Sequence, residues 1–221
     1  HPYKKNRPYA AGLIKIDHCI YLVISLLIIC VLLLINTNKN FIILIIIYFT
    51  ISNVYTFFLK KIIFIDLLIL SWLYTLRIIG GGLISDIDVS FWLIFFSLLF
   101  FGSLATIKRL IEVLNTKQSK GKKIFGRGYS KENKKILNII SITLGVISIL
   151  VLIFYTNSSQ IINMYSSPNI LWLINFIIFF WIMRIIVFSN RKIIKDDPIM
   201  FAIKDLTTYI CLFSIVCIMF I

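Results

Sequence analysis

Long apolar runs separated by short polar segments dominate the chain. Seven runs have close to 20 residues, at 18–36, 41–58, 62–83, 90–107, 136–155, 169–189 and 202–221. Because a helix rises about 1.5 Å per residue, about 20 apolar residues cross a hydrocarbon core roughly 30 Å thick. The runs are too long, and alternate too little, for the roughly ten-residue strands of a membrane barrel. The pattern therefore predicts an all-α integral membrane protein with seven transmembrane helices, since lipid offers unpaired backbone groups no partner.

Charge assigns the two sides of the membrane. Of the 221 residues 60% are hydrophobic, and 23 Lys and Arg against 9 Asp and Glu give a net charge of +14. Twenty basic residues lie on one side, in the N-terminal segment, at 60–61, at 108–135 and at 191–204, and only Lys39 lies on the other. The positive-inside rule puts the basic side in the cytoplasm, so we expect a multi-pass protein of a bacterial cytoplasmic membrane. The same charges also suit anionic lipid head groups, whereas no nucleic-acid recognition module is present.

Asp66 and Arg77 are the first functional candidates, because a charge at membrane depth costs a few kcal/mol unless it has a partner or faces water (roughly 3 kcal/mol on insertion scales). They are eleven residues apart on one predicted helix, so they share a face about 16 Å apart, too far for a direct salt bridge. Gly80 and Gly81 follow on that face. The glycines fit either close helix packing or a helix that loosens beside a cavity.

A second candidate site follows the fourth span. Lys108, Arg109 and Glu112 are spaced to share one helical face, and the run GRGYSKENKK adds Arg127 and Tyr129. A solvated charged face is one interpretation. The alternative is a phosphate site in which the cations and the hydroxyl bind the anion and Glu112 helps to hold Mg²⁺.

The segment DDPIMFAIKDL precedes the last span. Asp196 and Asp197 are explained by capping of a helix that starts at Pro198. Lys204 and Asp205 are harder to explain in this way, because they begin an otherwise apolar run at the membrane interface.

These polar segments, taken in order, resemble the UbiA superfamily of membrane prenyltransferases, and most of all its branch that makes polyprenyl-phosphate phosphoribose. The matching positions are His1, Pro2, Lys4, Arg7, Pro8 and Gly12, then Asp66, Leu76, Arg77, Gly80 and Gly81, then Lys108, Arg109, Glu112, Arg127, Tyr129 and Ser130, and finally Asp197, Pro198, Lys204 and Asp205. Family members have nine helices, so residues 1–221 are expected to be an N-terminally incomplete UbiA-type domain. The first two helices and the Asp-rich motif are expected upstream of His1, and the chain as given is expected to be inactive.

The resemblance implies Mg²⁺-dependent transfer of 5-phosphoribose from phosphoribosyl diphosphate to a polyprenyl phosphate lipid, with release of pyrophosphate. It implies catalytic or cavity-lining roles for Asp66, Arg77, Lys204 and Asp205. It implies substrate-binding roles for Lys4, Arg7, Lys108, Arg109, Arg127 and Tyr129. Glu112 is the candidate metal ligand.

Two other functions remain open at this point. One is transfer of a prenyl group from its diphosphate to an aromatic or other acceptor. The basic residues mildly favour a phosphorylated sugar over a flat aromatic acceptor, although topology also requires those charges. The other is a transporter or membrane scaffold, but the one glycine-interrupted segment, at 80–82, has no counterpart in the other half of the chain.

Overall fold

Six helices of the computed structural model are long and apolar enough to cross a membrane; the structure describes residues 9, 11–115, 124, 126–162, 168–194 and 197–220. These helices are α1 (Ile16–Leu34), α2 (Lys39–Phe57), α3 (Ile65–Ser85), α4 (Phe91–Asn115), α5 (Lys134–Thr156) and α7 (Trp172–Asn190). The shorter elements are α6 (Ser159–Ile162), α8 (Pro198–Ala202), α9 (Leu206–Met219) and 3₁₀ turns at Leu59–Lys61, Lys131–Asn133 and Pro168–Leu171. The described ranges contain helices and no strand, so the predicted all-α membrane fold is confirmed.

The ends of two predicted spans differ from those of the helices. The apolar fourth span ends at residue 107, and α4 continues to Asn115 through the predicted helical segment of Lys108, Arg109 and Glu112, with its last two turns packed inside the protein. The last predicted span, 202–221, contains α9, which has only 14 residues, so six long helices and not seven are found in the described ranges. α9 begins after Asp205, whose carboxylate accepts a hydrogen bond from the Thr208 amide and caps the helix. Asp197 caps α8 in the same way, as predicted for that acidic pair.

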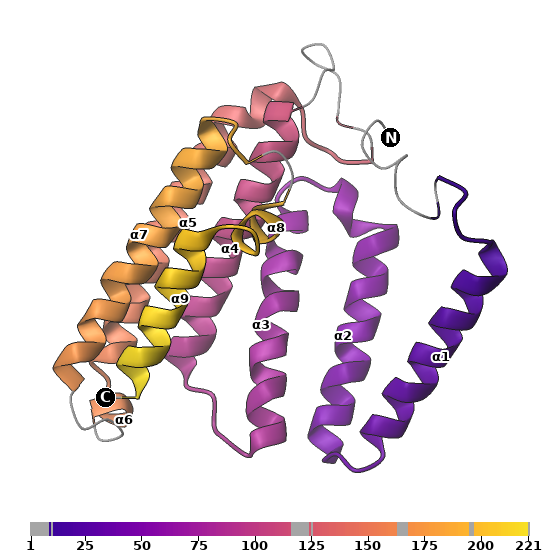
Figure 1. The fold of residues 1–221 in the computed structure, drawn as a ribbon, viewed down its shortest axis with the longest axis horizontal. Coiled ribbons are helices and arrows are strands. Elements are labelled where there is room, and N and C mark those ends of the chain that lie inside the picture. Colours follow the sequence, from indigo (N-terminus) through magenta and orange to yellow (C-terminus); the bar gives the residue numbers. More distant parts are fainter. Residues whose placement is uncertain are drawn as a thin grey trace.

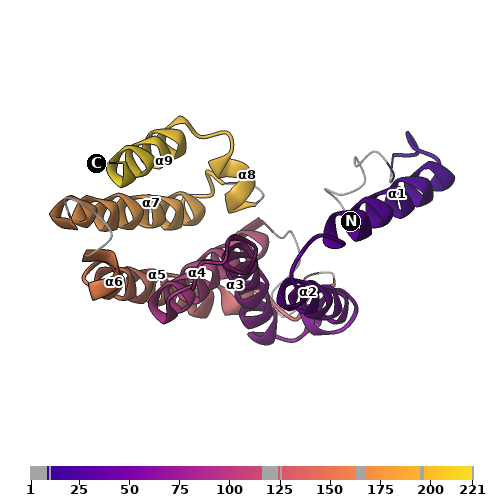
Figure 2. The same cartoon turned by 90° about the horizontal axis from the view of Figure 1, so that it is seen from below.

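The helices form an open arc. α3 packs between α2 and α4, α5 packs between α4 and α7, and α9 lies against α7. Seen from below, this order is followed around the arc, and α1 stands apart at its end (Figure 2). α1 buries none of its residues. The turn between α2 and α3 and the start of α5 lie at one end of the bundle, and the short helix α8 lies near that end, level with the start of α3 (Figure 1).

α4 is the centre of the packing. One of its faces meets α7 in a core that includes Ile107 and Ile182, and another meets α3 and α5 in a core that includes Leu110 and Leu137. Small residues let the backbones approach closely: a Cβ built on Gly102 would lie 3.1 Å from the Ser71 hydroxyl of α3. This close packing fixes α3 and α4 relative to one another, and the charged residues considered below project from these two helices.

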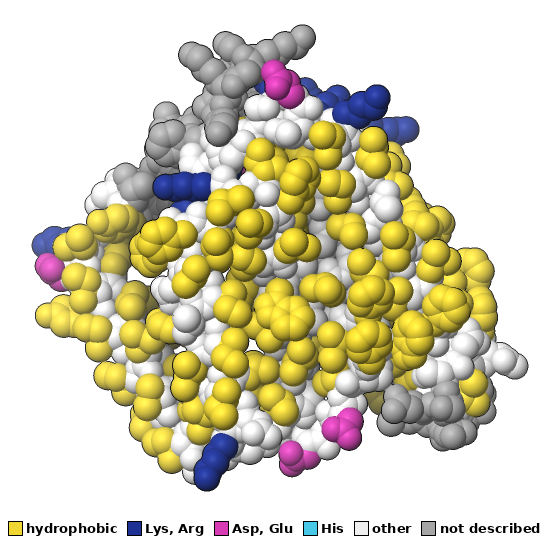
Figure 3. Space-filling view, turned by 180° about the vertical axis from the view of Figure 1, so that it is seen from behind, with side chains coloured by type: hydrophobic (Ala, Val, Ile, Leu, Met, Phe, Trp, Pro, Cys, Tyr) yellow, Lys and Arg dark blue, Asp and Glu magenta, His cyan; other side chains and the backbone are white. Residues whose placement is uncertain are grey.

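The outer surface is apolar between two charged ends. Figure 3 shows a broad band of hydrophobic side chains, with most Lys, Arg, Asp and Glu side chains above and below it. Large aliphatic side chains of the long helices are exposed, as at Leu68 of α3 and Leu150 of α5. Such a surface matches lipid rather than water, which agrees with a multi-pass integral membrane protein.

Candidate active site

The start of α3 brings an acidic side chain into the protein interior. Phe64, directly before the helix, has a positive φ of 67°, which is uncommon for a residue other than glycine. The chain then enters the first turn of α3, where a helix N-terminus favours negative charge. Asp66 occupies this turn, and its side chain is 0% exposed.

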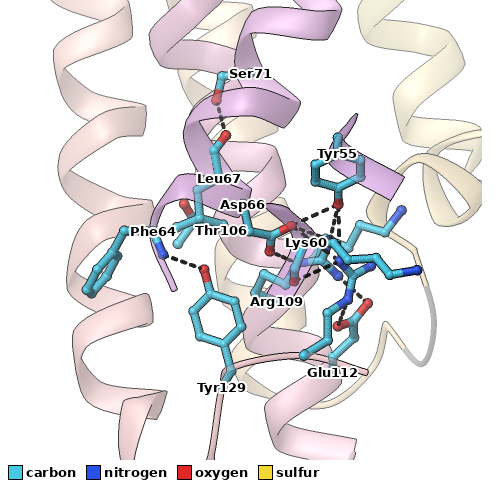
Figure 4. Close-up of polar contacts among 12 residues, drawn as sticks. Tyr55, Lys60, Phe64, Asp66, Leu67, Ser71, Thr106, Arg109, Glu112 and Tyr129 are labelled. Carbon is cyan, nitrogen blue, oxygen red and sulfur yellow. Dashed lines mark hydrogen bonds and ion pairs between the residues drawn. The ribbon is translucent and has the colours of Figure 1, made fainter. Parts of the chain in front are cut away.

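Four donors satisfy the Asp66 carboxylate. Nε of Arg109, on α4, lies 2.5 Å from Oδ2, and Nη2 of the same guanidinium lies 3.3 Å from Oδ1. Oδ1 also accepts from the Tyr55 hydroxyl of α2 at 2.8 Å and from Nη1 of Arg127 at 3.3 Å. Figure 4 shows Tyr55, Arg109 and Asp66 converging from three different helices. The buried charge is therefore paired and hydrogen-bonded, as a buried carboxylate must be.

Glu112 completes this group one turn further along α4. Its Oε1 accepts from Arg109 Nη1 at 2.5 Å, and its Oε2 lies 3.9 Å from Nε of Arg127. We call Tyr55, Asp66, Arg109, Glu112 and Arg127 the Asp66 cluster. Its two carboxylates and two guanidinium groups balance in charge.

Exposure differs across the cluster in a way that gives it an inner and an outer half. The side chains of Asp66 and Arg109 are 0% and 1% exposed, whereas those of Arg127 and Glu112 are 19% and 33% exposed. The outer half is therefore the part that a ligand can reach. The inner half holds the outer half in place through direct ion pairs.

The loop that carries Arg127 is fastened to the turn before α3. A Cβ built on Gly128 would lie 2.5 Å from the Lys61 carbonyl oxygen, so only glycine fits at this contact. Tyr129 is 1% exposed, and its hydroxyl accepts from the Phe64 amide at 3.1 Å. Burial raises the pKa of the Tyr129 phenol to about 12. Tyr129 is thus brought to the site, although as a buried side chain and not as a surface for ligand.

Lys108 does not join the cluster, contrary to the predicted shared face. Consecutive helical residues point about 100° apart, and its ammonium group is turned toward α8, where it forms an ion pair with Asp197. The same Asp197 caps α8 by accepting from the Ile199 amide at 3.0 Å. Lys108 therefore ties α8 to α4, and 34% of its side chain is exposed at the basic end.

Asp205 and Lys204 lie apart from the cluster. Asp205 receives a bidentate fork from Arg184 of α7, with Nη1–Oδ2 at 2.6 Å and Nη2–Oδ1 at 2.8 Å. The Arg184 guanidinium also lies over the Phe188 ring, 4.5 Å from its centroid. This pair joins α7 to the start of α9, which is a structural contact. Lys204 is exposed, and no ion pair involves it within the described part of the chain.

Arg77 lies in a groove between α2 and α3, away from the Asp66 cluster. Its guanidinium donates to the Tyr48 hydroxyl at 2.8 Å and lies 5.0 Å from the Tyr74 ring centroid. The groove has a volume of about 310 Å³, and its lining is Phe41, Leu44, Ile45, Tyr48, Leu76, Arg77, Gly80, Gly81 and Ile84. Arg77 is the one charged residue of this lining, and among the described residues it meets no carboxylate.

The structure brings together only part of the predicted set of site residues. Asp66, Arg109, Glu112, Arg127 and Tyr129 come together, whereas Arg77, Lys108, Lys204 and Asp205 lie in other surroundings. Lys4 and Arg7 lie outside the described residues. Sequence reasoning missed Tyr55 and Arg184. The sequence could have indicated Arg184, because it is a cation within an apolar span, as Arg77 is. It gives no indication of Tyr55, because only the packing of the helices shows which residues its hydroxyl contacts.

The described residues do not fit Mg²⁺ as a self-sufficient site. No group of three or more His, Cys, Asp or Glu side chains in the described ranges is arranged to hold a metal ion. Mg²⁺ prefers six oxygen ligands, and Glu112 offers two oxygens that already face Arg109 and Arg127. The role of Glu112 as a metal ligand stays a prediction, and the other described residues near it do not form a complete site.

Comparison with known proteins gives a family match and two relatives. The sequence model of the UbiA prenyltransferase family matches residues 1–168, a range that includes the whole Asp66 cluster but not the Arg184–Asp205 pair. Nodulation protein NoeC of Azorhizobium caulinodans is 28% identical over an alignment of 222 positions. The alignment covers 97% of this chain and 70% of NoeC. The uncharacterized protein y4nM of Sinorhizobium fredii is 30% identical over 164 residues, which cover 74% of this chain. The aligned part spans only 32% of the length of y4nM.

Proposed function

The chain belongs to the UbiA prenyltransferase family, and from that premise we propose that it transfers 5-phosphoribose from phosphoribosyl diphosphate to a polyprenyl phosphate lipid. Family membership supports a prenyltransferase-type enzyme in a membrane and disfavours a transporter or scaffold. The phosphoribosyl donor, the polyprenyl acceptor and the cytoplasmic orientation of the site are parts of the proposal.

The observation that carries the proposal is the outer half of the Asp66 cluster. Arg127 is partly exposed at the basic end of the bundle, and behind it Asp66 and Arg109 form a rigid buried pair. A guanidinium held in a fixed orientation is the group that best binds a phosphate or diphosphate by two parallel hydrogen bonds. The carbonyl of Lys60 accepts from Arg127 at 3.4 Å, so this lysine belongs to the same small region.

The proposed reaction is a substitution at C1 of the ribose. A phosphate oxygen of the lipid forms a bond to C1, while the bond from C1 to the diphosphate oxygen breaks. Pyrophosphate leaves with the bonding electron pair, so negative charge builds on it in the transition state. Arg127, together with Lys60 and Lys61, would stabilise that charge, which is the usual way in which fixed cations accelerate such a step. The apolar surface of the bundle would hold the lipid chain.

Enzymes of this family are generally metal-dependent. We propose Mg²⁺ as the metal, because it commonly accompanies diphosphate substrates. Glu112 is the carboxylate of the cluster with an exposed side, so it is the residue that could contribute one ligand. We assign no step of the reaction to a metal held by the described residues, since they do not form a complete site.

Prenyl transfer from a prenyl diphosphate to an aromatic or other acceptor is the second candidate. The family description names prenyl transfer, and a prenyl diphosphate donor would present the same diphosphate group to Arg127. The two candidates therefore differ in what is attached to the diphosphate and in the acceptor, and the anion site is common to both.

The test uses the full-length protein in detergent with Mg²⁺, polyprenyl phosphate and radiolabelled phosphoribosyl diphosphate. Labelled lipid is expected, and Arg127→Ala should lower its formation at least tenfold, which corresponds to about 1.4 kcal/mol. Arg191→Ala is the matched control, because Arg191 is an exposed arginine just after α7 that makes no ion pair within the described ranges. Absence of labelled lipid, alongside transfer from a prenyl diphosphate, would establish the second candidate instead.

A further inference from the structure

Tyr129 sits in the core directly beneath the Asp66 cluster. Its ring packs in the cluster of buried side chains that includes Leu67 of α3 and Leu110 of α4. Its hydroxyl points back to the chain and accepts the amide hydrogen of Phe64 (Figure 4). A substrate in the outer half of the cluster cannot reach this side chain, because only 1% of it is exposed.

The partner of that hydroxyl is a strained residue. Phe64 has φ 67° and ψ −41°, a conformation that costs on the order of 1–3 kcal/mol for a residue with a side chain. Such a conformation persists only where its surroundings hold it, and here the Tyr129 hydroxyl binds the amide that the turn leaves without a backbone acceptor. Asp66 follows two residues later, so this turn decides where the carboxylate is placed.

The other side of Tyr129 fixes Arg127. The Ile124 amide donates to the Tyr129 carbonyl at 2.8 Å, and the Arg127 amide donates to the Ile124 carbonyl at 3.0 Å. Gly126, with φ +72°, lies in the turn that these bonds close, and Gly128 rests on the Lys61 carbonyl. Arg127 therefore lies in a short turn that is closed by a hydrogen bond to the Tyr129 carbonyl.

We propose that Tyr129 is a positioning residue that sets Arg127 against Asp66. Its hydroxyl holds the Phe64 amide and so places the carboxylate at the start of α3, and its backbone carbonyl closes the turn that carries the guanidinium, so both halves of the ion pair depend on one residue whose ring is buried between them. This replaces the substrate-binding role predicted for Tyr129 from the sequence. The inference rests on the proposed function only for the nature of the anion that Arg127 binds.

A double-mutant cycle in the full-length protein separates positioning from a general structural role. The readout is pyrophosphate binding in detergent, and the variants are Tyr129→Phe, Arg127→Ala and the two combined. Tyr129→Phe removes one oxygen, and loss of one hydrogen bond of about 1 kcal/mol should weaken binding about fivefold. If Tyr129 acts through Arg127, the double variant binds no more weakly than Arg127→Ala alone. Independent, multiplying effects of the two changes would overturn the inference.

Hydrogen exchange gives a second measurement that needs no ligand. Tyr129→Phe should speed amide exchange in peptides covering 59–67 and 124–130, with little change in α7. Gly128→Ala should do the same, because its new methyl group would lie 2.5 Å from the Lys61 carbonyl oxygen. Gly81→Ala is the control, since a methyl group there meets nothing within 4 Å.

The two measurements distinguish failure of this inference from failure of the proposed function. Unchanged exchange at both segments in Tyr129→Phe overturns the positioning role, whatever the protein binds. If the parent protein binds no pyrophosphate, the proposed function is overturned. The positioning role of Tyr129 is then tested by amide hydrogen exchange in Tyr129→Phe alone.

Discussion

Asp66 Oδ2 lies 2.5 Å from Arg109 Nε, and neither side chain is more than 1% exposed. This pair connects the first turn of α3 to the last two turns of α4, which lie beyond the predicted apolar span. A buried ion pair adds little net stability compared with apolar residues of the same size, because both charges lose their hydration. Its contribution here is geometric, since it fixes Arg109 beside the more exposed side chains of Glu112 and Arg127.

Breaking the pair should be costly. Asp66→Asn leaves the Arg109 guanidinium with Glu112 as its remaining carboxylate partner, and we expect a loss of about 3 kcal/mol in the free energy of unfolding. Thermal unfolding in detergent, followed by tryptophan fluorescence, measures it. Glu132→Gln removes an exposed carboxylate and should change stability by less than about 0.5 kcal/mol. A loss below about 1 kcal/mol for Asp66→Asn would show that the pair is hydrated.

The apolar pattern predicts the fold because the bilayer imposes a length on each span. It predicts the ends of the spans less well, because burial of Leu110 and Val113 extends α4 and the Asp205 cap starts the last helix at Leu206. Neither effect is visible in hydropathy. Both depend on what the neighbouring helices place beside these residues.

In the candidate site, the sequence predicts contacts between residues a few positions apart on one helix, but it does not predict which residues of different helices meet. Arg109 and Glu112, three residues apart on one helix, meet as their spacing indicates. Lys108 instead forms an ion pair with Asp197, and Arg184 forms one with Asp205. These partners are far apart in the sequence, so the packing of the helices decides which of them meet. The criterion that singled out Arg77, a cation within an apolar span, also applies to Arg184 and would have made it a candidate, although not its pairing with Asp205.

The Arg184–Asp205 pair should hold α9 in place and should contribute little to transfer. Asp205→Ala removes a bidentate ion pair and a helix cap, so α9 should detach locally from α7. Limited proteolysis and hydrogen exchange should show faster cleavage and exchange in 203–220. Transfer activity, measured below the temperature at which this variant loses structure, should fall less than in Arg127→Ala. A larger fall, with unchanged exchange, would return Asp205 to the active site.

Arg77→Ala tests the groove between α2 and α3. A guanidinium at membrane depth with no carboxylate partner among the described residues calls for another role, and the adjacent apolar groove suits a lipid substrate. We expect turnover at low lipid concentration to fall at least tenfold, equivalent to about 1.4 kcal/mol. Arg191→Ala is again the control for loss of an arginine. Unchanged turnover would remove Arg77 from the site.

The buried phenol of Tyr129 should make the protein sensitive to alkali. Burial raises its pKa to about 12, whereas the phenol of an unfolded chain ionises near pH 10. Below pH 10 the phenol is protonated in both states, so its contribution to stability is complete. Between about pH 10 and 12 the unfolded chain releases its proton first, which favours unfolding, and stability therefore falls as the pH rises through this interval.

Comparison with Tyr129→Phe isolates this contribution, because all other tyrosines and lysines titrate in both proteins. The variant should melt at a lower temperature than the parent at pH 7.5, since the Phe64 amide loses its partner. From pH 9 to 11.5 its melting temperature should then decline less steeply than that of the parent. Tyr21→Phe, which removes the hydroxyl of an exposed tyrosine on α1, should keep the slope of the parent. Parallel curves for the parent and Tyr129→Phe would mean that the Tyr129 hydroxyl is accessible to solvent in the folded protein.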